Sequence, residues 1–344
     1  MQDELKVLSI IAPDLLADIG RRAQVLSGIE SMQPVGRRAL AARLNLPERE
    51  VRAAAAMLKD QGLITMDAAG MQLTESARDI LPQARELSRA MAGLSRLEQV
   101  LSSLLNVPHV VVVSGNADQD AQALRDVGRA AAHRIYKLLQ HGTIMAVAGG
   151  STMREVARGM QNGTNMDVMV LPARGGMGSS VETQANTIAA EMAGKLGGRH
   201  QSIHLPDNLD IAALQEMMKV PEIAEALSLL QNSGLIVHGV GRADIMAQQR
   251  RLNPDILETL RRKKAVGEAF GDFFDFNGQT VWQAGTVSAA LAHQNPHCKM
   301  VAVAAGEKKA EAIIASTRHD AHDTLITDEG AARRMIALLE EPLS

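Results

Sequence analysis

The sequence predicts an α/β protein of two domains, a small helical domain at the N-terminus and a larger domain built on a parallel β-sheet. The chain has 344 residues, whereas single domains of about 100–250 residues are the norm, so two domains are expected. Hydrophobic residues make up 46% and charged residues 22%, which is sufficient for a sizeable core. The spacing of apolar residues also changes at Pro108, from a helical period to short continuous runs.

The N-terminal region favours helices. Residues 1–31 place leucines and isoleucines three or four positions apart, and Pro13 predicts a kink or a break there. A short helix is expected over 37–44 and a second one over 48–61, with a turn at 45–47 between them.

Two strand-like runs, 63–66 and 71–73, then predict a hairpin around a loop that contains Gly70. Helix, turn, helix and hairpin in this order are typical of a winged helix-turn-helix, whose second helix enters the DNA major groove. We expect this domain to span 1–81. Its segment 20–60 has a local charge of +4 in a chain with a net charge of −3, which favours a surface that faces phosphate.

Five arginines are the candidates for contact with double-stranded DNA. Arg49 and Arg52 lie near the start of the second helix, where base contacts are usually made. Arg37, Arg38 and Arg43 lie on the preceding helix and suit phosphate contacts. The alternative is a helical packing module with solvated arginines. Aromatic residues make up only 2%, which argues against recognition of single strands or RNA by base stacking.

Residues 82–106 are expected to form one connecting helix, because leucine and methionine recur at a spacing of three or four. This apolar stripe either packs on the next domain or pairs with a second copy of the chain. The remaining residues, 107–344, then form the second domain.

The second domain contains seven short apolar runs that alternate with amphipathic helical stretches. This alternation predicts a doubly wound parallel sheet that is buried on both faces. The expected strands are 110–113, 144–148, 168–171, 202–205, 235–237, 301–304 and 324–326.

Gly149, Gly150, Ser151 and Thr152 join one of these strands to a helix. Such a junction suits a phosphate, because glycines let backbone N–H groups approach it, hydroxyls donate to it, and a helix N-terminus favours an anion. The alternative is a tight strand-to-helix turn without a ligand. The segment is neither a P-loop nor a dinucleotide fingerprint, since neither glycine spacing is present.

A second loop supports the phosphate interpretation. Arg174 follows another strand, is next to Gly175 and Gly176, and could bind a phosphate bidentately. Gln184 follows, with a side chain suited to sugar hydroxyls. Two further strands end in segments with glycine and basic residues, which places all four loops in one crevice at the carboxyl edge of the sheet.

No motif indicates catalysis. The sequence lacks HExxH, CxxC and GxSxG patterns and has no His/Cys cluster at metal-binding spacing, so we expect no catalytic residue, metal or cofactor. The single cysteine, Cys298, excludes an intrachain disulfide. No apolar run approaches the roughly 20 residues of a membrane span, and no secretory signal stands at the N-terminus. A cytoplasmic location is therefore expected.

The chain resembles the SorC/DeoR-type family of sugar-phosphate-responsive transcriptional repressors, in its glycolytic branch. The residues that carry the resemblance extend from about 13 to 338. They are 35–38, 149–152, 172–176, 184–187, 246–250, 268–271, 309–313 and 327–332.

The resemblance implies a repressor of glycolytic genes that forms a homodimer or homotetramer and is relieved by a phosphosugar, with fructose-1,6-bisphosphate the expected effector. It implies an effector domain similar to the glucosamine-6-phosphate deaminase and ribose-5-phosphate isomerase fold, without the chemistry. Ser151, Thr152 and Arg174 would then hold one phosphate, with Gln184 close to the sugar. The sugar hydroxyls and the other phosphate would be surrounded by Arg250, Glu268 and Lys309.

Two positions depart from the family pattern. Ser151 replaces a threonine and keeps the hydroxyl. Glu307 and Lys308 stand where the family has two serines, immediately before Lys309. This change bears on whether a second phosphate is bound, so a monophosphate or triose phosphate effector is the alternative. An active sugar-phosphate isomerase or deaminase is a further alternative.

Overall fold

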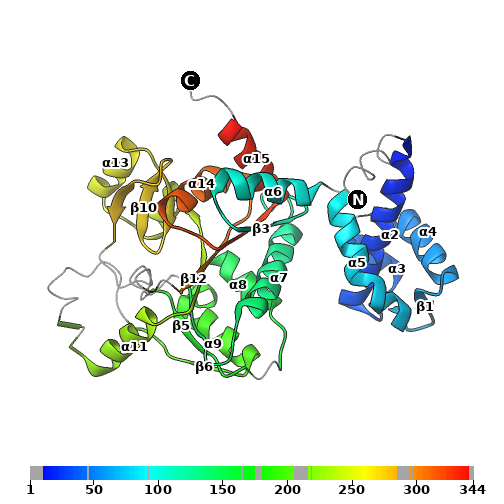
Figure 1. Ribbon diagram of the computed structural model, residues 1–344, viewed down its shortest axis with the longest axis horizontal. Helices are drawn as coiled ribbons and strands as arrows, with labels where there is room; N and C mark the ends of the chain where they lie inside the picture. The colour runs from blue at the N-terminus through cyan, green and yellow to red at the C-terminus, as the bar shows by residue number, and fades with distance from the viewer. Residues whose placement is uncertain are drawn as a thin grey trace. The chain divides into compact units, whose positions relative to one another are not determined.

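The computed structural model describes residues 11–44, 46–91, 93–163, 166–174, 180–204, 216–217, 219–284, 295 and 297–340. The chain divides into two compact units, Met1–Arg96 and Leu97–Ser344 (Figure 1). Each unit has its own core. Within the described part of the chain, no helix is both long enough and apolar enough to cross a membrane.

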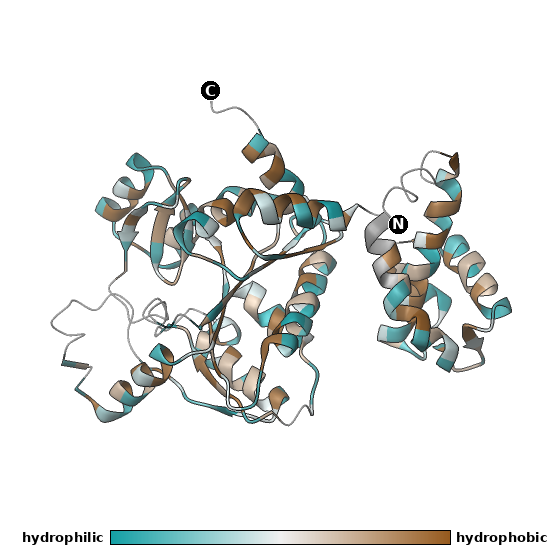
Figure 2. Ribbon diagram, viewed as in Figure 1, coloured by the Kyte–Doolittle hydropathy of each residue, from teal (hydrophilic) through white to brown (hydrophobic). Residues whose placement is uncertain are grey.

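The N-terminal unit has the predicted helix, turn, helix and hairpin. Its elements are α2 (Pro13–Met32), α3 (Arg37–Leu44), α4 (Glu48–Asp60), β1 (Ile64–Met66), β2 (Met71–Leu73) and α5 (Glu75–Met91). Val25, Ile29, Leu40, Val51 and Leu58 from the first three helices share one core. Figure 2 shows apolar residues gathered where these helices meet.

The hairpin depends on a glycine. Gly70 has a φ of +133°, and a Cβ at this position would lie 2.8 Å from the backbone nitrogen of Val35. Asp67 Oδ1 accepts from the backbone nitrogens of Ala69 and Gly70, which closes the turn. Val35 then bridges to Met71, so the segment between α2 and α3 joins the wing.

The expected single helix over 82–106 is wrong. The chain forms α5, which begins at Glu75, and a separate helix α6 (Leu94–Leu105). Gly93 between them has a φ of +72°, and this left-handed conformation ends a helix. Leu101 and Leu105 of α6 are buried, and Glu98 accepts a hydrogen bond from the backbone nitrogen of Val112. In α6, the apolar stripe therefore packs on the larger unit.

The larger unit contains the predicted parallel sheet. Its strands are β3 (His109–Val113), β4 (Ile144–Val147), β5 (Met169–Pro172), β6 (Arg199–His200), β7 (Leu235–Gly239), β12 (Lys299–Val303) and β13 (Thr324–Asp328). The spatial order is β3-β13-β12-β7-β4-β5-β6, and every neighbouring pair is parallel. The expected strand at 202–205 is absent over 202–204, with residue 205 outside the described residues.

Helices cover both faces of this sheet, as predicted. On one face, α7 (Ala121–Leu138), α8 (Ser151–Gly159) and α9 (Ala185–Leu196) pack on the strands through a core that includes Met145, Val147 and Val237. The other face packs against α11 (Pro221–Gln231) and α14 (Ala310–His319) through a core that includes Ile236 and Ala146. The helix α15 (Glu329–Glu340) follows the last strand.

A second, antiparallel sheet was not predicted. It has the order β11-β10-β9-β8, with β8 (Gly241–Arg242), β9 (Ala265–Ala269), β10 (Asp272–Asp275) and β11 (Thr280–Gln283). The helices α12 (Ala243–Gln249) and α13 (Pro254–Arg262) accompany it. Strands β9 and β10 turn through Phe270 and Gly271, which both have positive φ. Two-residue hairpin turns usually contain Asn-Gly or Asp-Gly, so the Phe-Gly sequence here does not predict a hairpin.

Candidate functional site

The strand order places a topological switch point between β4 and β7. From β4 the chain proceeds outward to β5 and β6, and from β7 it proceeds the other way to β12 and β13. Ligands of open parallel sheets bind outside the carboxyl ends of the strands at such a point. The predicted loops after β4, β5, β7 and β12 all leave the sheet from this edge.

The glycines after β4 have a packing role that the sequence did not reveal. A Cβ on Gly149 would lie 2.7 Å from the carbonyl oxygen of Thr183. Gly150 has a φ of +112°, and its N–H donates to the same carbonyl over 2.8 Å. This N–H is therefore already paired. The glycines bring the 3-10 turn η1 (Val181–Thr183) against the start of α8.

Two helix N-termini meet at this contact. Helix α8 begins at Ser151 and α9 begins at Ala185, next to η1, and neither helix has a hydrogen-bonding side-chain cap. Ser151 is exposed, while Thr152 is buried. Gln184 is the N-cap residue of α9. Uncapped N–H groups and two helix dipoles favour an anion here.

Arg174, Arg250 and Glu268 form the charged cluster of this edge. They come from the loop after β5, the end of α12 and the middle of β9. Glu268 Oε1 lies 3.8 Å from Arg174 Nη1 and forms an ion pair with Arg250 Nη2. The side chains of Arg174 and Arg250 are 13% and 14% exposed, and that of Glu268 is 5% exposed.

This cluster brings two guanidinium groups to the carboxylate of Glu268. Oε1 of Glu268 also accepts the backbone N–H of Gly271 over 2.7 Å, so the contacts with both arginines and with Gly271 are made by the same carboxylate oxygen. Two guanidinium groups that are close together and nearly buried attract an anion strongly, since little water screens them. The structure thus brings three of the expected effector residues together. Gly175 and Gly176 lie outside the described residues.

Lys309 lies at the same edge, on the 3-10 turn η3 (Glu307–Lys309) after β12. It is half-buried. Burial lowers the pKa of Lys309, while the nearby carboxylates of Asp118 and Asp328 act in the opposite direction. Lys309 belongs to a separate group of charges from the Arg174–Glu268–Arg250 cluster.

Asp328 has a structural role at this edge of the sheet. It is fully buried at the end of β13. Its carboxylate accepts from the backbone nitrogens of Ala117, Gly306 and Ala331 over 2.6, 3.0 and 3.0 Å. Ala331 lies in the first turn of α15, so Asp328 caps this helix and ties two neighbouring loops to it.

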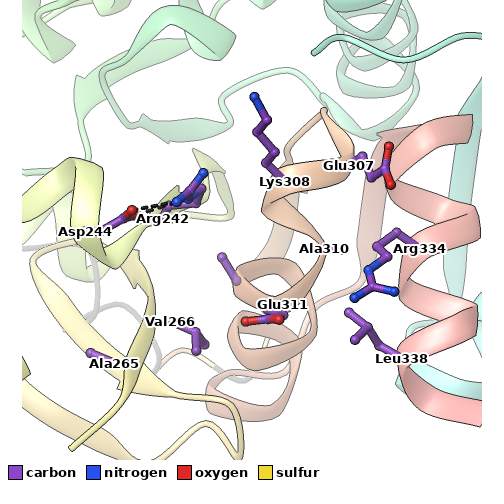
Figure 3. A pocket seen from close by; sticks show the side chains of 11 residues that line it. Arg242, Asp244, Ala265, Val266, Glu307, Lys308, Ala310, Glu311, Arg334 and Leu338 are labelled. Carbon is purple, nitrogen blue, oxygen red and sulfur yellow. Dashed lines mark hydrogen bonds and ion pairs between the residues drawn. The ribbon is translucent and has the colours of Figure 1, made fainter. Parts of the chain in front are cut away.

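A cavity of about 350 Å³ lies beside η3 and is distinct from the charged cluster (Figure 3). Its lining joins Arg242 and Asp244, which form an ion pair, to Lys308, Glu311 and Arg334. None of the expected effector residues lines it. Its cationic and carboxylate side chains are balanced, so it has no evident preference for an anion.

The five arginines that the sequence predicts to contact DNA are mostly exposed. Arg37, Arg38, Arg49 and Arg52 are exposed, whereas Arg43 is half-buried and less available for phosphate than expected. Arg38 and Arg52 share one carboxylate, with nitrogens 3.5 and 3.2 Å from Glu48. Exposed ion pairs of this kind contribute less than about 1 kcal/mol, so a phosphate can replace Glu48 at little cost.

The chain matches two family models and several known proteins. Residues 19–88 match the "CggR N-terminal DNA binding domain" and residues 89–337 match the "Putative sugar-binding domain". The central glycolytic genes regulator of Priestia megaterium is 38% identical over 339 residues, covering 98% of this chain and 99% of that protein. Its namesake in Bacillus subtilis is 35% identical over 327 residues, covering 95% and 96%.

Solved structures of transcription regulators have a similar fold. A SorC family transcriptional regulator from Enterococcus faecalis has a TM-score of 0.65 and 34% identity, covering 70% of this chain and 99% of that one. The full-length sorbitol operon regulator SorC from Klebsiella pneumoniae shares the fold with a TM-score of 0.65 at 17% identity, covering 95% of this chain and 98% of that one.

A winged DNA-binding unit joined to an α/β sugar-binding unit defines a ligand-responsive transcription regulator of the SorC class. Within this class, the chain belongs to the family of the central glycolytic genes regulators. It is a regulator and not an enzyme, because its relatives over nearly the whole chain are regulators.

Proposed function

We propose that this protein represses glycolytic genes by binding operator DNA and releases or loosens the DNA when fructose-1,6-bisphosphate binds. The names of the two relatives support the choice of genes. The observation that carries the effector assignment is the Arg174–Glu268–Arg250 cluster, in which two nearly buried guanidinium groups lie at the same sheet edge as the two uncapped helix N-termini. One phosphate would bind at Ser151 and Thr152, and the other near Lys309.

The alternative effector is a sugar monophosphate or a triose phosphate. Glu307 favours this alternative, because it lies on the same turn as Lys309 and its carboxylate accepts a hydrogen bond from Asn116 Nδ2 over 3.2 Å. A carboxylate at this position repels a second phosphate. The choice between the two effectors therefore depends on how strongly Lys309 outweighs Glu307.

The effector is identified by thermal shift. Fructose-1,6-bisphosphate, fructose-6-phosphate, dihydroxyacetone phosphate and inorganic phosphate are compared at equal concentrations. A ligand at about 100 times its Kd stabilises the folded protein by about 2.7 kcal/mol. The bisphosphate is expected to give the largest shift. A larger shift with fructose-6-phosphate supports the monophosphate alternative, and no shift with any sugar phosphate contradicts the proposed effector class.

Repression is tested separately with DNA. Labelled fragments from upstream of glycolytic genes are titrated with the protein, with and without about 1 mM fructose-1,6-bisphosphate. This concentration saturates a site whose Kd is well below about 1 mM. Weaker or less cooperative binding with the sugar supports induction. Unchanged affinity and unchanged cooperativity contradict it, because an effector shifts a conformation only through its differential affinity.

The proposed repressor is a homodimer or homotetramer. Dimers of helix-turn-helix proteins bind two half-sites that are related by the two-fold axis of the protein. Ile11 and Leu15 on the N-terminal side of α2 are 74% and 52% exposed, which offers an apolar surface to a second copy. Sedimentation equilibrium with and without fructose-1,6-bisphosphate measures the state, and a monomer under both conditions contradicts this part of the proposal.

A further inference from the structure

The loop after β3, residues 114–120, holds the η3 turn in place through backbone contacts. Lys308 donates its backbone N–H to Asp118 Oδ2 over 2.8 Å, and Glu307 donates its own to Asn116 Oδ1 over 3.5 Å. Gly306 has a φ of +103°, and a Cβ there would lie 2.9 Å from Asp118 Oδ1. The carboxylate of Asp118 therefore lies directly against the turn that precedes Lys309.

The loop is itself fixed to the sheet, so it can act as a scaffold. Ala117 donates to the buried carboxylate of Asp328, which also accepts from Gly306. Gly330 donates to the carbonyl oxygen of Gly115 over 3.0 Å. Three strand ends, those of β3, β12 and β13, are thereby joined at η3. A substitution at Asp118 is therefore expected to change the position of the turn.

The charges around η3 act on the Lys309 ammonium. Asp118 and Asp328 both favour its protonated form, while burial disfavours it. Glu307 and Lys308 lie on the turn itself. From α15, Glu329 lies near Gly115 and pairs with Arg333, and Arg334 lines the cavity beside Lys308. Asp118 and Asp328 both bond to the backbone here and act on Lys309. Asp328 accepts from Gly306, just before the turn, whereas Asp118 accepts from Lys308 within it.

We propose that Asp118 is a positioning residue of the effector site, which anchors the η3 turn and sets the position and the electrostatic surroundings of the Lys309 ammonium for an anionic ligand. The assignment of Lys309 to the effector site rests on the proposed function. Asp118 itself touches no ligand in this proposal. Its carboxylate acts through the backbone N–H of Lys308 and through its charge.

The test compares Asp118→Asn with Asp120→Asn in the full-length protein. Asparagine at 118 keeps an oxygen for the Lys308 N–H but removes the charge. Asp120 is a matched control, because it lies on the same loop and caps α7 by accepting from Gln122, a role that asparagine also fills. Each variant loses one negative charge, and the two positions are only two residues apart in the chain.

The first readout is the pKa of Lys309, measured by competitive labelling with acetic anhydride and mass spectrometry over a range of pH. Asp118→Asn is expected to lower this pKa relative to the wild type, and Asp120→Asn is expected to leave it nearly unchanged. Equal values in all three proteins overturn the proposal. This readout needs no ligand, so it remains decisive if the proposed effector is wrong.

The second readout is the affinity for fructose-1,6-bisphosphate as a function of pH. Asp118→Asn is expected to bind about 3- to 10-fold more weakly near neutral pH, a modest loss because Asp118 is exposed and its charge is screened. The decline in affinity with rising pH is expected to begin at a lower pH than in Asp120→Asn. The ligand's own titration is common to both proteins.

A double mutant separates positioning from general stability. In a Lys309→Met background, Asp118→Asn is expected to cause no further loss of affinity, because its effect passes through Lys309. Additive losses overturn the proposal. If the wild-type protein binds no sugar phosphate at all, the proposed function fails, and the labelling experiment alone then decides the role of Asp118.

Discussion

Glu268 is the residue on which the charged cluster depends. Two guanidinium groups and one backbone N–H converge on its carboxylate in a buried setting. A buried ion pair contributes little by itself, but removing one partner leaves the other charge uncompensated. Glu268 therefore holds the two arginines close together, where one anion could contact both.

The change Glu268→Gln is expected to lower the free energy of unfolding by about 3–5 kcal/mol without ligand, because two nearly buried guanidinium groups lose the carboxylate that they share. Added inorganic phosphate should restore more stability in this variant than in the wild type. Urea denaturation with and without phosphate measures both effects. Glu311→Gln, at an exposed carboxylate of α14, is the control. Equal stability of the two variants contradicts the interpretation.

His319 provides a pH-dependent contact between α14 and the antiparallel sheet. Its Nε2 lies 3.9 Å from carboxylate oxygens of Asp272 and Asp320, and its Nδ1 donates to the carbonyl of Gly278. The bond to Asp272, helped by Asp320 and Gly278 and opposed by burial, raises the pKa of His319 from 6.5 to about 9. The imidazole is therefore charged in the folded protein at neutral pH.

A raised histidine pKa stabilises the folded state fully below the unfolded pKa and loses this contribution as pH rises through the folded value. Stability is thus expected to fall between pH 6.5 and about 9, by at most about 3.4 kcal/mol at 1.36 kcal/mol per unit. His319→Gln should have a flatter profile over this window. Chemical denaturation at several pH values measures it, and parallel profiles for the two proteins argue against this role.

At the scale of elements, close packing of α7 on α8 depends on glycine. A Cβ on Gly128 would lie 2.4 Å from the carbonyl oxygen of Glu155, and one on Gly159 would lie 2.9 Å from the Cα of Arg129. The two helices can approach this closely because each presents a glycine to the other. Helix α8 begins at the proposed phosphate-binding residues, so this packing also places the site.

Gly128→Ala is expected to destabilise the protein by about 1–3 kcal/mol, because the new methyl group must push α8 away. Effector affinity should fall as well, since the start of α8 shifts. Gly194→Ala in α9 is the control, because a Cβ there meets nothing within 4 Å, and alanine favours a helix. Denaturation curves that rank the two variants in the opposite order would falsify the packing argument.

At the scale of the whole molecule, the proposed regulation requires two functions that mutations can separate. Arg49 and Arg52 belong to the DNA-binding unit, and Arg174 belongs to the sugar-binding unit. A regulator of this kind couples the two by a free energy that acts equally in both directions. Because the two sets of residues lie in different units, a substitution in one unit should abolish the function of that unit and leave the binding function of the other.

Arg174→Ala is expected to abolish the response to the effector and to leave DNA affinity intact. Arg49→Ala and Arg52→Ala should weaken DNA binding, each by about 1–3 kcal/mol if the side chain reads a base, and leave effector binding intact. Fluorescence titrations of DNA and thermal shifts with fructose-1,6-bisphosphate measure the two functions. A normal effector response in Arg174→Ala means that the phosphate site lies elsewhere.

The pattern of apolar and turn residues predicted many helices and strands, because each of these elements depends on residues close together in the sequence. Apolar runs identified six of the seven parallel strands, and the order of helices and hairpin identified the winged unit. The break at Gly93 was missed because the leucine stripe continues on either side of it. The antiparallel sheet was missed because its strands are short and its tight turn is Phe270-Gly271.

By itself, the sequence determined the two-domain organisation, the parallel sheet, the basic helix pair and the family, and the resemblance named residues for the effector site. Only the tertiary structure decided which of these meet. Glu268 joins Arg174 and Arg250 across three elements, Lys309 stands apart with Asp118 and Asp328, and Gly150 is committed to Thr183. The reason is physical: periodicity reports which side of an element is buried, whereas contacts between distant residues depend on strand order and on how closely the backbones pack.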